Sequence, residues 1–218
     1  ANLSYPFWSN SRPQFCGHPR FKLDCEGDNV TINMASKNFH VIDVHSNART
    51  LTITRMDLWG TKCPKEFQNI TLDYPFFNYT SNDVNSTILY DCDPLESTPN
   101  PVNLSSAMIF ACPINGNLRR AYFSLVGDRW FNKTALGCSI NITVPVLGKA
   151  AGRFIEDAID PADVIAQGFE VEWELIEEGQ CENCRKSGGR CGYDVNIGGF
   201  TCFCPNQSYD QHKLCLTG

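Results

Sequence analysis

Three segments near the N-terminus alternate apolar and polar residues with the two-residue period of a β-strand. They read NVTINM at 29–34, FHVIDVH at 39–45 and RTLTITRM at 49–56, and they are rich in Val, Ile and Thr. The turn-forming stretches EGDN and HSNA lie beside them. The pattern predicts a β-meander with one buried face.

The alternation is clearest in GFEVEWELI, at residues 168–176. One face of this strand would carry four apolar residues and the other three glutamates (Phe169, Val171, Trp173 and Leu175 against Glu170, Glu172 and Glu174). The best helix start of the chain comes just before it, with Asp160 as N-cap and Pro161 at the first helical position. That helix can extend only to about Gln167, because Gly168 ends it. We therefore expect a mostly β fold with short helices.

The composition allows one large or two small hydrophobic cores, with 218 residues of which 42% are hydrophobic and 19% charged. Residues 1–150 carry 13 basic and 12 acidic side chains, whereas residues 151–218 carry 5 and 12, so +1 and −7 give the net charge of −6. A polyanion would be repelled by the acidic C-terminal part, which disfavours nucleic-acid binding and places any polyanion site in the N-terminal part. The simpler interpretation of the acidic part is a solvated surface that maintains solubility.

Twelve cysteines and nine N-x-[ST] sequons indicate an oxidising, secretory environment. Chance alone would give about two sequons for this content of Asn, Ser and Thr. We therefore expect disulfides from Cys16, Cys25, Cys63, Cys92, Cys112, Cys138, Cys181, Cys184, Cys191, Cys202, Cys204 and Cys215. The predicted N-glycosylation sites are Asn2, Asn29, Asn69, Asn78, Asn85, Asn103, Asn132, Asn141 and Asn206.

The stretch CENCRKSGGRCGYD, at 181–194, leaves open a zinc site or a disulfide knot. Zinc is the weaker interpretation, because no histidine pair with metal-binding spacing lies near the C-x2-C motif. The chain has no signal peptide and no run of 18 apolar residues, so we expect a processed or expressed extracellular piece whose membrane anchor lies outside it.

The last six cysteines follow the spacing C-x2-C-x6-C-x10-C-x-C-x10-C, with GGF before the C-x-C. This segment resembles an epidermal-growth-factor-like (EGF-like) knot, and the resemblance implies the pairs Cys181–Cys191, Cys184–Cys202 and Cys204–Cys215. In about forty residues such bridges replace a hydrophobic core, at roughly 2–4 kcal/mol each. The stretch IEEGQC is a poor match to the calcium-binding version of the module, so we expect no calcium, no other metal and no cofactor.

Longer strings resemble a known family. LSYPFW…RPQFCGHPRFKLDC and DLWGTKCP resemble the galacturonan-binding module of plant wall-associated receptor kinases. TILYDC, FACP, GFEVEWEL and CENCRKSGGRCGYD…FTCFCP resemble the C-terminal wall-associated-kinase module, particularly that of the leaf-rust-resistance-locus receptor-like kinases. Relatives usually carry two more cysteines before SYPF. The pairing of the first six cysteines here therefore stays open among 15 connectivities, with a local Cys16–Cys25 bridge favoured.

A faint internal repeat suggests two related modules, because LSYPFW at 3–8 is echoed by LDYPFF at 72–77. The alternative is that two aromatic core strands look alike by chance. The expected fold is thus mostly β and disulfide-rich, with two tandem β-modules, short helices and a C-terminal EGF-like knot. The predicted domains are a galacturonan-binding-like module at 1–68, a second β-module at 69–178 and the EGF-like segment at 179–218.

The resemblance implies the ligand-sensing ectodomain of a plant receptor-like serine/threonine kinase, on the cell-wall side of the plasma membrane, which binds pectin and signals in defence or wall monitoring. Galacturonate carboxylates call for cations, and sugar rings for aromatic faces. The candidate binding residues are Tyr5, Trp8, Arg12, Arg20, Lys22, Arg49, Arg55, Lys62 and Lys65. The simpler interpretation is that the scattered cations are solvated and that Trp8 belongs to the core. Residues 1–69 hold 8 basic and 6 acidic side chains, so binding would be weak and sensitive to salt.

The main alternative is a protein- or peptide-recognition receptor or co-receptor in immunity, without carbohydrate binding, for which a partner ectodomain is conceivable. Glycans between Asn69 and Asn141 would cover the middle of the chain and leave the N-terminal sheet and the C-terminal knot accessible. An enzyme is disfavoured, because the chain has no G-x-S-x-G, H-E-x-x-H or phosphate-binding glycine motif.

Overall fold

The computed structural model describes residues 3–93, 108–125, 136–157, 159–175, 177–205 and 214–215. The chain folds into two compact units that are not consecutive in sequence. The first unit contains Ala1–Val41, Asp73–Phe77 and Trp173–Gly218, and the second contains Ile42–Leu72 and Asn78–Glu172. The predicted domains, with boundaries at residues 68 and 178, are consecutive stretches of sequence, unlike these units, and they stay a prediction.

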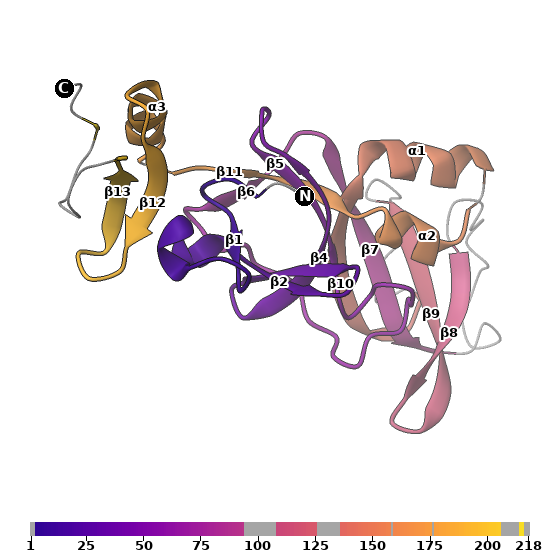
Figure 1. Ribbon diagram of the computed structural model, residues 1–218. Coiled ribbons are helices and arrows are strands. Elements are labelled where there is room, and N and C mark those ends of the chain that lie inside the picture. Colours follow the sequence, from indigo (N-terminus) through magenta and orange to yellow (C-terminus); the bar gives the residue numbers. More distant parts are fainter. Residues whose placement is uncertain are drawn as a thin grey trace. The chain divides into compact units, whose positions relative to one another are not determined.

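The first unit begins with four strands, shown in indigo in Figure 1, of which the third and fourth correspond to the first two strands of the predicted meander. β1 (Trp8–Ser9) runs parallel to β2 (Lys22–Glu26), and the turns η1 (Gln14–Cys16) and η2 (Pro19–Phe21) connect them. β2 pairs antiparallel with β3 (Asn29–Met34), which pairs antiparallel with β4 (Lys37–His45). Leu23, Ile32 and Phe39 are buried, so period-two alternation buries one face, as the sequence predicts.

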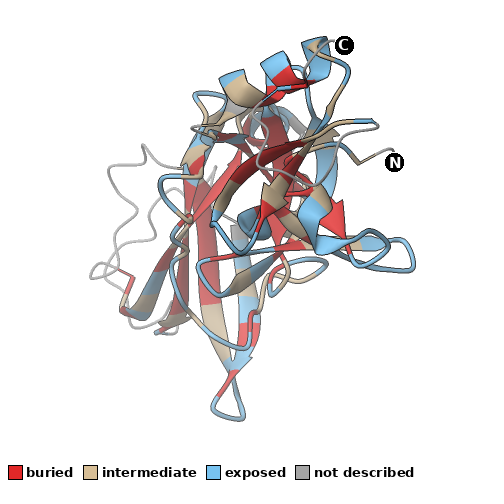
Figure 2. Ribbon diagram, turned by 60° about the vertical axis from the view of Figure 1, so that its left-hand side comes forward, coloured by how far each residue is buried: buried red, intermediate tan, exposed pale blue. Residues whose placement is uncertain are grey.

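The core of the first unit is made of aromatic rings. Phe7 packs edge to face against Phe21 and Trp173, with ring centroids 5.4 and 4.9 Å apart. Phe21 also packs against Phe77 at 4.9 Å. Such edge-to-face pairs contribute about 0.5–1.5 kcal/mol each beyond the burial of their area. Figure 2 shows the buried positions gathered on the strands, while hairpin tips are exposed.

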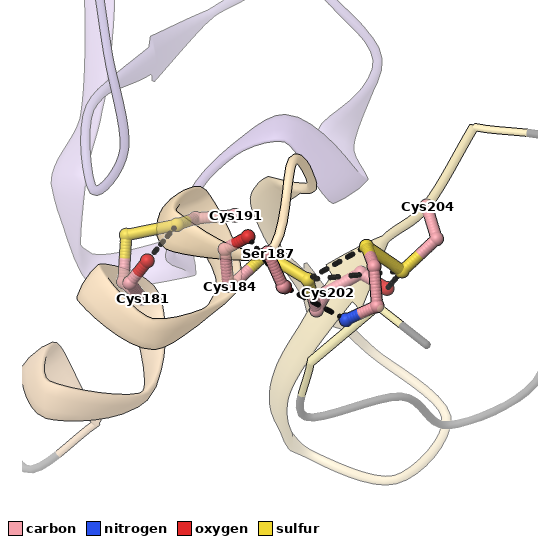
Figure 3. The surroundings of a disulfide bond; sticks show 7 residues. Cys181, Cys184, Ser187, Cys191, Cys202 and Cys204 are labelled. Carbon is pink, nitrogen blue, oxygen red and sulfur yellow. Dashed lines mark hydrogen bonds between the residues drawn. A yellow bond between two sulfur atoms is a disulfide. The ribbon is translucent and has the colours of Figure 1, made fainter. Parts of the chain in front are cut away.

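The C-terminal part of the first unit is the disulfide knot. It consists of α3 (Glu178–Lys186) and the antiparallel hairpin of β12 (Arg190–Asp194) and β13 (Gly199–Phe203). Its disulfides are Cys181–Cys191, Cys184–Cys202 and Cys204–Cys215, the pairing that the EGF-like resemblance implies. Ser187 lies among the sulfurs, where its hydroxyl donates to the Cys184 carbonyl and accepts from the Cys215 N–H (Figure 3).

Gly189 is the residue that lets the knot close. A Cβ at this position would lie 2.4–2.8 Å from the sulfurs of Cys202, Cys215 and Cys184. No side chain fits at such distances, so the second glycine of the SGGR stretch is a packing requirement of the disulfide cluster.

The second unit contains a four-stranded antiparallel sheet in the order β10-β7-β9-β8. Its strands are β7 (Asp83–Cys92), β8 (Met108–Ile114), β9 (Asn117–Leu125) and β10 (Cys138–Leu147). α1 (Gly148–Asp157) and α2 (Pro161–Ala166) bury Phe154, Val164 and Ile165 in its core with Ile88 and Phe123. β5 (Thr50–Arg55) pairs antiparallel with β11 (Phe169–Trp173), and β6 spans Phe77–Tyr79.

Two strands test the predicted alternation. Phe169, Val171 and Trp173 of β11 are buried while Glu172 is exposed, which confirms the prediction. β5 differs, because all six of its residues are buried. Its polar positions find partners inside the protein, and the Thr54 hydroxyl donates to the Ile165 carbonyl at 2.8 Å. The half-exposed strand predicted from sequence is therefore covered on both faces.

The predicted helix is confirmed. The Asp160 carboxylate accepts the Ala162 N–H at 2.7 Å, α2 ends at Ala166, and Gln167 is its C-cap. Gly168 follows with φ of +75°, and a Cβ there would lie 2.3 Å from the Ile53 carbonyl oxygen. The sequence reasoning missed α1 and α3, because neither starts at a capping side chain. Among the described residues, no helix is long and apolar enough to cross a membrane.

The other six cysteines form two disulfides and leave two thiols free, which corrects one predicted bridge. Cys63 pairs with Cys112, and Cys92 pairs with Cys138 across neighbouring positions of β7 and β10. The favoured Cys16–Cys25 bridge is wrong, since both thiols are free. Cys16 is half-buried at the end of η1, whereas Cys25 is exposed on β2, so closeness in sequence does not bring the two sulfurs together.

Candidate functional site

A cleft of about 660 Å³ lies in the first unit, where the N-terminal segment meets the disulfide knot. Three arginines and three aromatic residues contribute to its lining: Arg12, Arg185, Arg190, Tyr5, Phe15 and Phe203. The half-buried thiol-bearing residue Cys16 also borders it. Among the described residues that line it, none is acidic.

Aromatic packing holds the walls of the cleft together. The ring of Phe15, in η1, lies 5.1 Å from the ring of Phe203, in β13. Tyr5 packs edge to face on Phe200 at 5.9 Å, and His18 packs on Tyr193 at 4.8 Å. These pairs join the first twenty residues to the knot hairpin, so residues distant in sequence form one surface.

The three arginines reach the cleft from different elements. Arg12 precedes η1, and its Nη1 donates to the Leu3 carbonyl at 2.5 Å. Arg185 lies in the last turn of α3, and Arg190 opens β12 opposite Phe203. All three are exposed, and none forms an ion pair with another described residue. A guanidinium without a counter-ion is available to a ligand carboxylate, to which it can donate two parallel hydrogen bonds.

Tyr5 lines the same wall, although its hydroxyl is not exposed to the cleft. Its hydroxyl is buried and has no hydrogen-bond partner among the described residues. Burial, with a smaller contribution from the charge of Glu177, raises the pKa of Tyr5 well above its ordinary value. The phenol therefore stays protonated and keeps a hydrogen-bond donor.

Of the nine residues predicted from sequence, the structure brings Tyr5 and Arg12 together in the cleft. Trp8 is buried and its indole N–H donates to the His18 carbonyl at 3.0 Å, so it is a core residue, as the simpler interpretation held. Arg20 pairs with Asp73 at 3.2 Å, and Lys22 pairs with Asp24 at 2.8 Å.

The other four predicted cations belong to the second unit. Arg55 is buried, binds the Asp57 carboxylate at 2.9 and 2.6 Å and donates to the Gln68 carbonyl at 2.9 Å, so it has a structural role. Lys62 forms an ion pair with Asp160, and Arg49 and Lys65 are exposed. None of these four lines the cleft.

Arg185 and Arg190 are not among the residues predicted from the sequence, because the acidic balance of the C-terminal part favours a polyanion site in the N-terminal part. The signal was present in CRKSGGR, where three basic residues lie beside Gly189, the glycine that the disulfide cluster requires. Whether these basic residues share a site with Arg12 depends on the knot packing against η1, and the spacing of residues along the chain does not show this packing.

Most of the predicted N-glycosylation sites among the described residues lie in the second unit, whereas the cleft belongs to the first. Asn69, Asn78, Asn85 and Asn141 belong to the second unit, whereas Asn29 is the described sequon of the first. Asn29, Asn69, Asn85 and Asn141 are exposed and Asn78 is half-buried, and Asn2, Asn103, Asn132 and Asn206 lie outside the described residues. None of the described sequon asparagines borders the cleft.

Two other cavities have the wrong chemistry for an anion. One, of about 460 Å³, is bordered by Asp83 and by the sequon residues Asn69 and Asn85, and the other contains Glu170. The sulfurs of Cys202, Cys204 and Cys215 lie within 4.8 Å of one another, a spacing that would suit a metal. All three belong to disulfides, so they offer no thiolate, and the C-x2-C stretch is a disulfide element.

Comparison with known proteins agrees with this architecture. Residues 1–55 match the family described as wall-associated receptor kinase galacturonan-binding, and residues 112–207 match wall-associated receptor kinase C-terminal. The chain belongs to the ectodomains of the wall-associated receptor kinase family. Both matched regions are extracellular regions rather than catalytic domains, and no solved structure matches the chain.

Several relatives in Arabidopsis thaliana align along nearly the whole chain. They include leaf rust 10 disease-resistance locus receptor-like protein kinase-like 2.1, at 25% identity over 97% of this chain, and the 2.8 form, at 29% over 93%. The 1.3 form is 30% identical over 88% of the chain. The alignments cover 33%, 23% and 26% of these relatives, so this wall-associated-kinase ectodomain spans about a quarter to a third of their length.

Proposed function

We propose that this ectodomain is the ligand-sensing part of a plant receptor-like serine/threonine kinase and binds an acidic cell-wall polysaccharide of the galacturonan type. The match of residues 1–55 to the galacturonan-binding family is the observation that carries the proposal. In this proposal the ectodomain acts on the cell-wall side of the plasma membrane, to which a segment outside this chain attaches it. The receptor signals in defence or wall monitoring.

The physical chemistry of the first unit supports an acidic ligand. A galacturonan presents one carboxylate per sugar ring, and arginines without counter-ions are the side chains best suited to pair with it. The protein as a whole is acidic, with a net charge of −6, so such binding depends on a local cationic surface rather than on overall attraction. The affinity should therefore fall steeply as salt screens these charges.

A binding measurement on the glycosylated ectodomain tests the proposal. A galacturonate oligomer about ten residues long would be titrated by calorimetry at about 20 mM and 500 mM salt, where the Debye length falls from about 20 Å to about 4 Å. The fully methyl-esterified oligomer is the uncharged control. We expect binding of the acid form at low salt, marked weakening at high salt and no binding of the ester. Absence of binding at low salt would overturn the proposal and leave a protein or peptide ligand as the alternative.

A further inference from the structure

The cationic cleft of the first unit is built jointly by two parts of the chain that match different families. Arg12 comes from the region that matches the galacturonan-binding family, whereas Arg185 and Arg190 come from the region that matches the C-terminal family. Because both regions line one cleft, we infer that Arg12, Arg185 and Arg190 together form the carboxylate-binding site for an acidic sugar chain. The disulfide knot is then part of the ligand site. This inference rests on the proposed function and assigns the binding site of the acidic polysaccharide to this cleft.

Three features of the cleft carry the inference. Within the described part of the chain, its lining includes three arginines and no carboxylate, and none of the three arginines has an ion-pair partner there. Two or three guanidinium groups around one cavity repel one another unless an anion lies between them. Such an arrangement without an internal counter-ion is typical of a site for an external anion.

The aromatic residues favour a sugar over a simple inorganic anion. Tyr5, Phe15 and Phe203 give the cleft apolar surface beside the cations, and a pyranose ring has an apolar face that packs on an aromatic ring. A volume of about 660 Å³ exceeds what one carboxylate or phosphate needs and accommodates a short stretch of sugar chain. Cations and rings together therefore fit alternating carboxylates and sugar faces.

The knot itself provides rigidity for two of the arginines. Arg185 lies one residue after Cys184, and Arg190 lies one residue before Cys191, so each is anchored by a neighbouring disulfide. Ser187 and Gly189, between them, are held in the disulfide cluster. Because the backbone at these positions is already fixed, binding has to order only the two arginine side chains, which lowers the entropy cost of association.

Neighbouring residues offer matched controls for the mutational test. Arg185→Ala and Arg190→Ala each remove one cleft cation. Lys186→Ala removes the same charge one position along α3, from an exposed side chain paired with Glu182 at 2.6 Å that does not line the cleft. Arg20→Ala is the corresponding control for the N-terminal region, since Arg20 pairs with Asp73 outside the cleft.

We expect each cleft variant to weaken binding of the galacturonate oligomer by about threefold to tenfold at low salt, and the Arg185→Ala/Arg190→Ala double variant by about thirtyfold. The Lys186→Ala and Arg20→Ala variants should stay within about twofold of the unmodified protein. Unchanged melting temperatures and an intact disulfide map show that each variant is folded. Equal losses for cleft and control variants, or no loss for the double variant, would overturn the site while leaving the proposed function intact.

Cys16 supplies a second readout that needs no mutation, because its free thiol borders the cleft while that of Cys25 lies exposed on β2. The bound oligomer should slow the reaction of Cys16 with N-ethylmaleimide and leave the rate at Cys25 unchanged. Equal rates with and without a saturating oligomer would contradict the location. A polyglutamate peptide that binds more tightly through the same arginines would show that the ligand is an acidic peptide and overturn the sugar assignment.

Discussion

The carbonyl oxygen of Phe15 lies 2.3 Å from the position that a Cβ would occupy on Gly192. This close approach brings η1 against β12, and it explains why glycine stands in the CGYD stretch of the knot. The ring of Phe203 occupies the same space, with its Cε2 also 2.3 Å away. Any side chain at 192 must push the knot away from the N-terminal segment.

Gly192→Ala should therefore destabilise the first unit by about 1–3 kcal/mol, because overpacking forces a shift of backbone rather than of a flexible side chain. It should also weaken galacturonate binding, since the two walls of the cleft separate. Gly199→Ala, on the partner strand β13, is the control, because a Cβ there meets nothing within 4 Å. Thermal unfolding of both variants is the measurement, and equal stabilities would show that the contact carries no strain.

Arg55 is predicted to be a structural residue. Arg55→Ala removes a buried guanidinium that binds Asp57 twice and donates to the Gln68 carbonyl, so we expect a loss of about 2–3 kcal/mol in the free energy of unfolding. Lys65→Ala, which removes an exposed cation, should change it by less than about 0.5 kcal/mol. Urea unfolding measures both. Galacturonate binding by folded Arg55→Ala should match that of the unmodified protein, and a selective loss of binding would contradict this role.

Asp83 should make the stability of the second unit depend on pH. Burial raises its pKa from 3.8 to about 6, a rise limited by hydrogen bonds from the backbone N–H groups of Glu170 and Thr80 and enhanced by the charge of Glu170. Between about pH 4 and pH 6 the folded state thus binds more protons at this group than the unfolded state. The contribution of Asp83 to stability is greatest below pH 4 and is lost as the pH rises through 6.

Asp83→Asn should remove this dependence while it keeps an acceptor for the Glu170 N–H, which Oδ1 of Asp83 now accepts at 2.8 Å. Relative to the variant, the unmodified protein should lose on the order of 1 kcal/mol between pH 4 and pH 6.5, after allowance for a carboxyl group that is only half-buried. The check is urea unfolding across this range. Parallel pH profiles for the two proteins would show that Asp83 has an ordinary pKa.

The disulfides should differ in their contribution according to the loops they close. Cys63–Cys112 spans 49 residues and Cys181–Cys191 spans 10, so loop-closure entropy gives about 4 and about 2.7 kcal/mol respectively. Replacing each pair by alanine and measuring the unfolding free energy tests this order. Peptide mapping without reduction should show five bridges and free thiols at Cys16 and Cys25, and a Cys16–Cys25 peptide would contradict the structure.

Several elements could be predicted because their signals are local. The strands β3 and β11 follow from alternation, and α2 follows from Asp160, Pro161 and Gly168. α1 and α3 escaped because their first residues carry no capping side chain, and α3 was hidden among cysteines. β5 reads as a half-exposed strand, yet it is buried on both faces because of residues far along the chain that cover it.

The candidate site was predictable only in part for the same reason. Tyr5 and Arg12 follow from the rings and cations of the N-terminal module, but the same residue types there include the buried Arg55 and Trp8. Neither the burial of Arg55 nor its bonds to Asp57 and Gln68 can be read from the alternating pattern around it.

From its amino-acid order alone, this protein could be recognised as disulfide-linked and β-rich, because residue periodicity, sequon content and cysteine spacing are properties of neighbouring positions. The resemblance of strings such as LSYPFW and CENCRKSGGRCGYD to the wall-associated kinases added the family. Which thiols meet, and which cations share a surface, depended on how distant segments pack. Aromatic contacts such as Phe15 with Phe203 join the segments that bring Arg12, Arg185 and Arg190 to one cleft, and Cys16 and Cys25 stay unbridged in the folded chain. Long-range packing of this kind is a property of the folded chain as a whole.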